Sequence, residues 1–215
     1  MWAAFMGVDL FRAWSAATGL LLVLFLMLHL GGVVMAPFAP ASFEIYAAAL
    51  HQSAWLPFAE FAFLAAAFIH LALSLAKLIV NRRTGNRAAL VSRRGDRLAV
   101  LAARSQAIGG LILLGFLVVH LLQLRWPRPA AGEELIALRA LLAQPANVAL
   151  YLLAAVAVSL HVFHGGEAAH RSLGLLDPVN GFRIRRVFRM LALLLGGGFS
   201  VVALLVSASA LQMGQ

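Results

Sequence analysis

Four histidines lie inside long apolar stretches of the sequence, and these side chains are the best suited to chemistry. They are His29, His70, His120 and His161, and each stands in a different charge-free run. A polar, ionisable side chain inside a lipid bilayer is costly and is usually functional. A single histidine of this kind is explained by packing as readily as by a ligand role. Four of them on consecutive runs favour a shared task.

The depths of the four histidines sort them into two pairs. If the runs are helices that cross a membrane in alternating directions, His29 and His120 both lie toward the outer ends of their helices. His70 and His161 each lie about eight residues before the cytoplasmic end of their helix. Because each residue of a helix rises ~1.5 Å along the axis, these two histidines lie at the same depth. Two imidazoles at each of two levels are expected for two stacked b-type haems, each held by two histidines. His164, one turn after His161, is the second choice for the ligand on that helix.

Other metals fit this pattern less well. Zinc and iron–carboxylate sites need three or four converging ligands, often with Asp or Glu, and the apolar runs are nearly free of acids. The chain has no cysteine, so it supplies no ligand for an iron–sulfur cluster and no covalent attachment for a c-type haem. Haem b is therefore the predicted cofactor.

Small and basic residues near the histidines could accommodate such a macrocycle. Gly19 and Gly110 each stand ten residues before an outer histidine, and glycine on a helix face permits close approach. Cations at the cytoplasmic helix ends could pair with the propionates of the inner haem, although basic side chains there also snorkel to the interface. The candidates are Arg104, Arg171 and Lys77.

The composition shows which elements must position these residues. Of the 215 residues, 63% are apolar and 12% are charged, and the mean hydropathy is +0.92. A soluble domain carries about 45–50% apolar residues, so the class is an integral membrane protein. A bilayer crossing needs about 20 apolar residues. The sequence predicts one all-α transmembrane domain over 1–215, a bundle of five helices near 13–36, 54–78, 101–124, 146–169 and 187–211. The first of these runs is too long for a secretion signal, so a retained helix is expected.

The basic residues indicate orientation rather than a nucleic-acid partner. The net charge is +9, and most of the basic residues fall at the N-terminus and in the segments between the second and third and between the fourth and fifth helices. Basic loops stay in the cytoplasm. The N-terminus is therefore predicted to be cytoplasmic and the C-terminus outside. The basic residues of this predicted cytoplasmic side are Arg12, Lys77, Arg82, Arg83, Arg87, Arg93, Arg94, Arg97, Arg104, Arg171, Arg183, Arg185, Arg186 and Arg189.

Four sequence motifs, in order, resemble the single-chain, di-haem cytochrome b subunit of quinol:fumarate reductases and succinate:quinone oxidoreductases. They are W-S-A-A-T-G-L before His29, F-I-H-L-A-L-S-L-A-K around His70, S-Q-A-I-G-G through V-V-H-L around His120, and S-L-H-V-F-H-G-G through G-L-L-D around His161. The resemblance covers essentially the whole chain. It is greatest to the five-helix fumarate reductase type that works with menaquinone.

The resemblance implies a bacterial inner-membrane anchor for two cytoplasmic partners, a flavoprotein carrying FAD and an iron–sulfur protein. Menaquinol would be oxidised near the outer haem, and electrons would pass through both haems to the clusters and the flavin, where fumarate is reduced. The dicarboxylate site would then lie in a partner subunit, and a dimer of heterotrimers would be conceivable. The missing cysteines agree with clusters on another chain.

Two further positions take their interest from this family. In it, a glutamate after a phenylalanine between the first two helices is tied to quinol oxidation, and Phe43-Glu44 stands in the matching place. A carboxylate there could accept a quinol proton. From the residues alone, a solvent-exposed acid in a loop is an equally good interpretation. The branch with a transmembrane proton route also carries a glutamate two residues before the fourth ligand, where this chain has Ser159.

Two other functions remain open at this point. One is the cytochrome b subunit of a hydrogenase or a formate dehydrogenase, whose motif around the fourth histidine is less similar. The other is a cofactor-free transporter that uses its histidines as proton relays. The pairing by depth and the lack of acids at mid-helix speak against the transporter.

Overall fold

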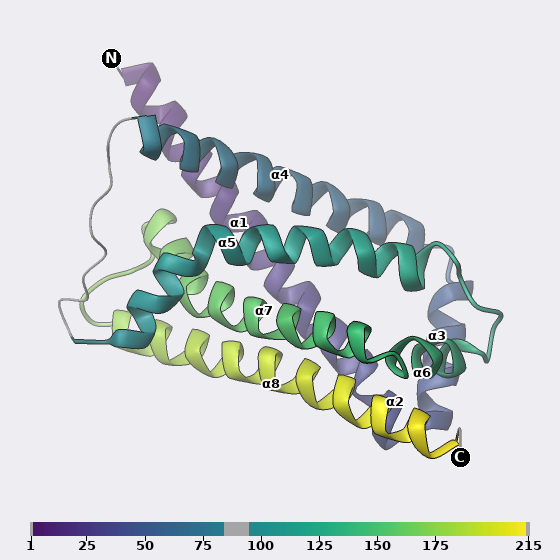
Figure 1. Ribbon diagram of the computed structural model, residues 1–215. Coiled ribbons are helices and arrows are strands. Elements are labelled where there is room, and N and C mark those ends of the chain that lie inside the picture. Colours follow the sequence, from purple (N-terminus) through teal and green to yellow (C-terminus); the bar gives the residue numbers. More distant parts are fainter. Residues whose placement is uncertain (1, 84–94, 214–215) are drawn as a thin grey trace. The chain divides into compact units, whose positions relative to one another are not determined.

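Five long helices dominate the computed structural model, which describes residues 2–83 and 95–213 (Figure 1). They are α1 (Trp2–Val33), α4 (Leu56–Arg83), α5 (Arg97–His120), α7 (Pro145–Ser172) and α8 (Gly181–Met213). Each contains a segment long and apolar enough to cross a membrane. Every regular element in the described ranges is helical. The predicted all-helical class and its five apolar helices are confirmed.

The helices extend beyond the apolar runs because charged residues continue them. The start of α8 shows this, since the apolar run begins near residue 187 but the helix begins at Gly181. Asp177 Oδ1 accepts hydrogen bonds from the backbone N–H groups of Val179 and Asn180, both at 2.7 Å. This turn directs the chain into the helix. Hydropathy thus marks the membrane segment, and local hydrogen bonds mark the helix end.

The connection at 37–53, between the first two predicted membrane helices, is largely helical. It contains α3 (Pro40–Gln52), preceded by the four-residue α2 (Met35–Phe38). Pro40 occupies the first turn of α3, where its missing N–H has no partner to lose. A third short helix, α6 (Glu134–Leu142), lies between α5 and α7. These helices are shorter than the apolar length that marks a membrane span, so hydropathy does not reveal them.

A π-helical segment, η1 (Leu121–Arg125), follows α5 directly after His120. Its helix-type hydrogen bond runs from the Trp126 N–H to the Leu121 carbonyl, at 2.9 Å. Short π-helical turns within helices are rare and occur frequently at functional sites.

The chain forms two compact units. Unit 1 comprises residues 1–25, 58–107 and 160–192, and unit 2 comprises 26–57, 108–159 and 193–215. Four of the long helices, α1, α5, α7 and α8, contribute residues to both units, whereas α4 belongs to unit 1 except for Leu56 and Pro57. The short helices α2, α3 and α6 all belong to unit 2.

Close contacts between α7 and α8 stabilise each unit. In unit 1, Gly166 lies against the buried Phe188, and a Cβ on this glycine would come within 2.0 Å of the ring. In unit 2, Gly196 lies against Ser159, with a Cβ position 2.7 Å from that of the serine. Small residues at such positions let membrane helices approach closely.

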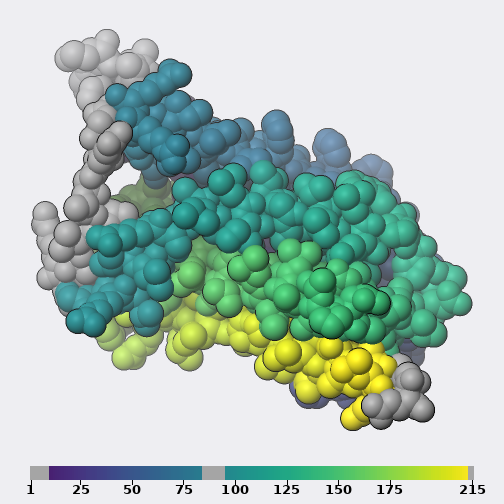
Figure 2. Space-filling model, in the orientation of Figure 1, coloured from purple at the N-terminus to yellow at the C-terminus, as the bar shows by residue number. Residues whose placement is uncertain are grey.

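Apolar side chains are also exposed along α5. The exposed residues of α5 follow helical spacing and include Leu101, Ile108, Leu111 and Val118. This helix is seen in teal at the surface in Figure 2. An apolar stripe on the outside suits a lipid environment.

Candidate cofactor-binding site

The structure brings together His70 of α4 and His161 of α7 in unit 1. Their ring centres lie 6.3 Å apart, with 71° between the ring planes. The ring that faces His70 is thus that of His161, while His164 lies half-buried further along α7. These are the two histidines that the sequence assigned to one depth.

Backbone and side-chain oxygens of α1 fix the tautomer of His70. Its Nδ1 lies 3.0 Å from the Ser15 carbonyl oxygen and 3.5 Å from the Thr18 hydroxyl. A carbonyl oxygen only accepts, so Nδ1 is the nitrogen that carries the hydrogen. The Nε2 of His70 is then left with a lone pair. Histidines that bind metals are typically held in this way by a partner on the other nitrogen.

Gly19, one of the residues predicted to accommodate a macrocycle, contacts His70. A Cβ on Gly19 would lie 2.9 Å from Cε1 and 3.2 Å from Nδ1 of that ring. The absence of a side chain at Gly19 therefore permits the orientation that His70 adopts. Gly110 is half-buried on α5, and its role beside a cofactor stays a prediction.

Two polar atoms around His161 are buried without a hydrogen-bond partner among the described residues. One is the Nδ1 of His161, and the other is the Oε1 of Gln106. The amide nitrogen of Gln106 donates to the His161 carbonyl, at 3.5 Å. Buried polar atoms are normally satisfied, so each such exception needs an explanation. A polar or charged group at this place would supply one.

In unit 2, His29 of α1 lies next to His120 of α5. The ring centres are 5.9 Å apart, with 79° between the planes. Phe116 stacks on His120 at 5.4 Å and 25°, and Phe199 lies 5.9 Å from His29. The Nδ1 of His120 lies 3.1 Å from the Tyr151 hydroxyl.

Both pairs have ring-centre separations close to that of two imidazoles bound to one metal ion. Metal–imidazole bonds of about 2.0–2.1 Å on opposite sides of one ion place the two ring centres ~6.3 Å apart. The observed separations are 6.3 Å and 5.9 Å. Within residues 2–83 and 95–213, no group of three or more His, Cys, Asp or Glu could hold a metal ion. Two histidines in each unit are the protein ligands that a b-type haem takes.

Glu44, the predicted proton acceptor, lies on α3 beside a second acid of α6. Its Oε1 accepts a hydrogen bond from the Leu135 N–H at 2.8 Å, and its Oε2 is buried without a partner in the described ranges. The second acid, Glu134, is only 7% exposed. Glu134 also contacts His51 of α3, with 3.1 Å between Oε1 and Nδ1.

The two carboxyls differ in acidity. Burial raises the pKa of Glu44. The Leu135 N–H offsets part of this rise, and the neighbouring Glu134 adds to it. Burial alone would also raise the pKa of Glu134, but its interactions with Glu44, the Gly132 N–H and His51 outweigh burial and lower that pKa. Glu44 is thus the member of the pair that holds a proton to higher pH.

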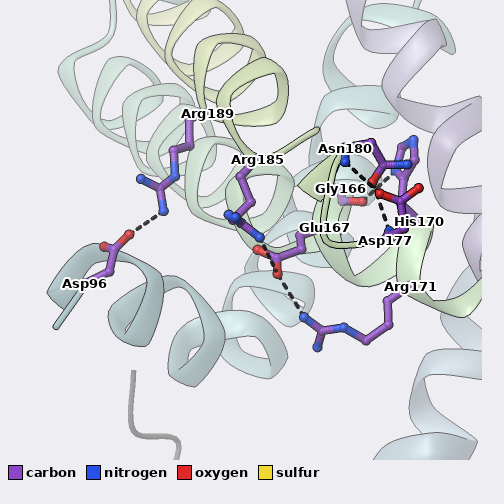
Figure 3. Close-up of polar contacts among 9 residues, drawn as sticks. All are labelled: Asp96, Gly166, Glu167, His170, Arg171, Asp177, Asn180, Arg185 and Arg189. Atoms are coloured by element: carbon purple, nitrogen blue, oxygen red, sulfur yellow. Dashed lines mark hydrogen bonds and ion pairs between the residues drawn. The ribbon is translucent and has the colours of Figure 1, made fainter. Parts of the chain in front are cut away.

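The cations predicted to meet the propionates are all exposed: Arg104, Arg171 and Lys77. Arg171 pairs with Glu167 at 2.8 Å, and Arg185 lies 3.6 Å from the same carboxylate (Figure 3). Arg189 of α8 pairs with Asp96, which precedes α5 (Figure 3). Of the arginines that indicated orientation, Arg87, Arg93 and Arg94 lie outside the described residues.

Sequence reasoning missed the residues that hold the histidine rings. Ser15 acts through its backbone carbonyl, which no side-chain pattern reveals. Tyr151 stands in the predicted helix that follows the one with His120, and nothing in the sequence indicates that the two side chains meet. A tyrosine hydroxyl in an apolar run needs a partner, and this requirement could have drawn attention to it.

Comparisons of the chain with family models, curated proteins and solved structures found no match.

Proposed function

We propose that this chain is the haem-binding membrane anchor of a quinol:fumarate reductase or succinate:quinone oxidoreductase. The observation that carries the proposal is the pair of facing histidines in each unit, with ring centres 6.3 Å and 5.9 Å apart. His70 and His161 would hold one haem b, and His29 and His120 the other. Haem iron would supply one-electron transfer between menaquinol and the iron–sulfur partner.

The chain's own residues would prepare these sites before the cofactor binds. The Ser15 carbonyl holds the proton of His70 on Nδ1 and leaves Nε2 as the ligand atom. Stacking by Phe116 restrains His120 in unit 2. Orientation of the ligands in advance lowers the cost of binding.

Glu44 would accept a proton from the quinol at its outer site. Its buried Oε2 has no hydrogen-bond partner among the described residues, so a quinol hydroxyl placed beside it would satisfy this oxygen. A base works best when its pKa lies near the working pH, and the raised pKa of Glu44 moves it in that direction. Proton transfer onward would follow Glu134 and His51, since these two side chains are 3.1 Å apart.

Ser159 bears on whether turnover moves charge across the membrane. The chain has this serine in place of a carboxylate. Ser159 packs against Gly196 of α8, which leaves little space for a larger side chain. We infer that turnover is electrogenic or that protons take another route. Proteoliposomes with pH and voltage probes test this inference, and proton uptake that depends on Ser159 would contradict it.

Orientation and partners complete the proposal. A cytoplasmic N-terminus places the basic segments toward the flavoprotein and iron–sulfur subunits, as the excess of arginines there favours. The membrane would be a bacterial inner membrane.

A reduced-minus-oxidised absorption spectrum of the purified chain tests the proposal directly. We expect b-type bands and about two haems per chain. We expect His29→Ala and His120→Ala to lose one haem, and His70→Ala and His161→Ala the other. His164→Ala is the matched control and should keep both. A wild-type chain without haem bands would refute the proposal and favour the histidine-relay transporter.

A further inference from the structure

A chain of four side chains in unit 2 ends at Nδ1 of His120 and has a single direction. It links His120 to Tyr151, then to Gln123 and Asn147, with distances of 3.1, 3.3 and 3.0 Å. The last member, Asn147, donates from Nδ2 to the Leu141 carbonyl at 2.9 Å. Two helices and the π-helical segment η1 thus contribute to one network.

The direction follows from the backbone carbonyl at the far end. Because the Leu141 oxygen only accepts, the Asn147 amide must present its NH₂ there and its Oδ1 to Gln123. Gln123 then donates through Nε2 and turns its Oε1 toward Tyr151. The orientation of both amides is fixed by the network rather than by either contact alone.

The tyrosine passes this direction on to the histidine. Its hydroxyl hydrogen goes to Gln123 Oε1, which leaves the phenolic oxygen as an acceptor. The nitrogen 3.1 Å away, Nδ1 of His120, must then be the donor. The Nε2 of His120 is consequently the nitrogen with a free lone pair. Phe116 restrains the same ring and lies edge-to-face with Tyr151 at 4.9 Å.

We propose that Tyr151, supported by Gln123 and Asn147, is a positioning residue that fixes the tautomer of His120 and sets the reduction potential of the haem in unit 2. This inference rests on the proposed function. The hydrogen bond draws the Nδ1 proton toward oxygen and makes Nε2 a more basic ligand. A more basic ligand stabilises the oxidised iron, so the network lowers the potential of this haem.

The two sites are asymmetric in this respect. His70 uses a backbone carbonyl, which no substitution removes, and His161 Nδ1 has no partner among the described residues. Among the hydrogen bonds of the described histidines given above, the one to a tyrosine is that of His120 in unit 2. A change at Tyr151 should therefore affect one haem and leave the other unchanged.

The test is a redox titration of the purified, haem-loaded chain, comparing wild type with Tyr151→Phe. Phenylalanine keeps the ring that packs on Phe116 and removes only the hydroxyl. We expect one of two steps to move to higher potential, by threefold to tenfold in the reduction equilibrium, where tenfold is ~59 mV for one electron. Loss of that step in His120→Ala identifies it. Gln123→Ala should shift the same step upward by less.

Tyr46→Phe is the matched control, since it removes the other tyrosine hydroxyl of the sequence, which lies beside Gly32 in unit 2. Both steps should stay at their wild-type potentials in this variant. If the wild-type chain shows two haem steps, three results for Tyr151→Phe would overturn the inference and leave the proposed function standing. These are no shift, a downward shift, and equal shifts of both steps. A wild-type chain without haem would overturn both.

Discussion

Gly19→Ala tests whether close approach of α1 to α4 sets the position of His70. The new Cβ would lie 2.9 Å from His70 Cε1, whereas carbon atoms in contact are about 3.5–4.0 Å apart. The ring must then move by roughly 0.6–1.1 Å. The Ser15 carbonyl, 3.0 Å from Nδ1, opposes that movement.

The cost follows from these two contacts. A ring turned about 30° from its preferred rotamer costs of order 0.5–1.5 kcal/mol. A weakened hydrogen bond to Ser15 adds about 0.5–1.5 kcal/mol. Together they amount to about 1–3 kcal/mol, which corresponds to haem affinity lower by roughly 5- to 150-fold at the site in unit 1.

Haem titration into the apoprotein, followed by absorption, measures this loss. Gly31→Ala is the control, because nothing lies within 4 Å of its Cβ position on the same helix. Both variants gain the same helix propensity, about 1 kcal/mol, so their difference isolates the contact. We expect the weakened site to be the one lost in His70→Ala. Wild-type affinity at both sites in Gly19→Ala would refute the reasoning.

Three further predictions concern pH and packing. The rate of quinol oxidation should increase as pH rises through the raised pKa of Glu44, because only the ionised carboxylate accepts a proton. Glu44→Gln should abolish this increase with pH. An unchanged pH–rate profile in this variant would contradict the role of Glu44 as proton acceptor. The Ala99 N–H, and then Arg189, hold the pKa of Asp96 below its ordinary value. The stabilisation that ionised Asp96 gives should therefore be complete above the ordinary pKa and disappear as pH falls through the lowered pKa. Asp96→Ala should cost about 1 kcal/mol in thermal unfolding at neutral pH and much less in acid, and an equal loss at both pH values would contradict this prediction. Gly166→Ala should destabilise the chain by about 1–3 kcal/mol because its Cβ would overlap Phe188, while Gly115→Ala, with open space around it, should not; equal melting temperatures would rule out the predicted clash.

Much of the architecture was predictable because the membrane imposes a simple rule. Backbone groups in a bilayer must be satisfied within the helix, so apolar length marks each crossing. The facing histidines were predictable for a related reason, since alternating helix directions convert sequence position into depth. His29 and His120 are neighbours in the structure although they are 91 positions apart in the sequence.

The rest depended on contacts that residue types do not reveal. The α3 helix lacks the length that hydropathy detects, and its role in holding Glu44 appears only once α6 lies beside it. The hydrogen bond from His70 goes to a backbone oxygen, which every residue possesses. The tyrosine that contacts His120 comes from a different helix, and pairing between helices depends on their rotation. Rotation about a helix axis is poorly fixed when apolar residues surround the helix.

The π-helical turn after His120 has a consequence for chain length. A π turn accommodates one more residue than an α turn, and η1 adds this wider turn to the end of α5. Deletion of one residue before Gln123 would let this turn wind as an α turn and would shift Gln123 relative to His120. The contact between Gln123 Oε1 and the Tyr151 hydroxyl depends on this winding. Without that contact the Tyr151 hydroxyl would lose its acceptor, and the direction of its hydrogen bond with His120 would no longer be fixed.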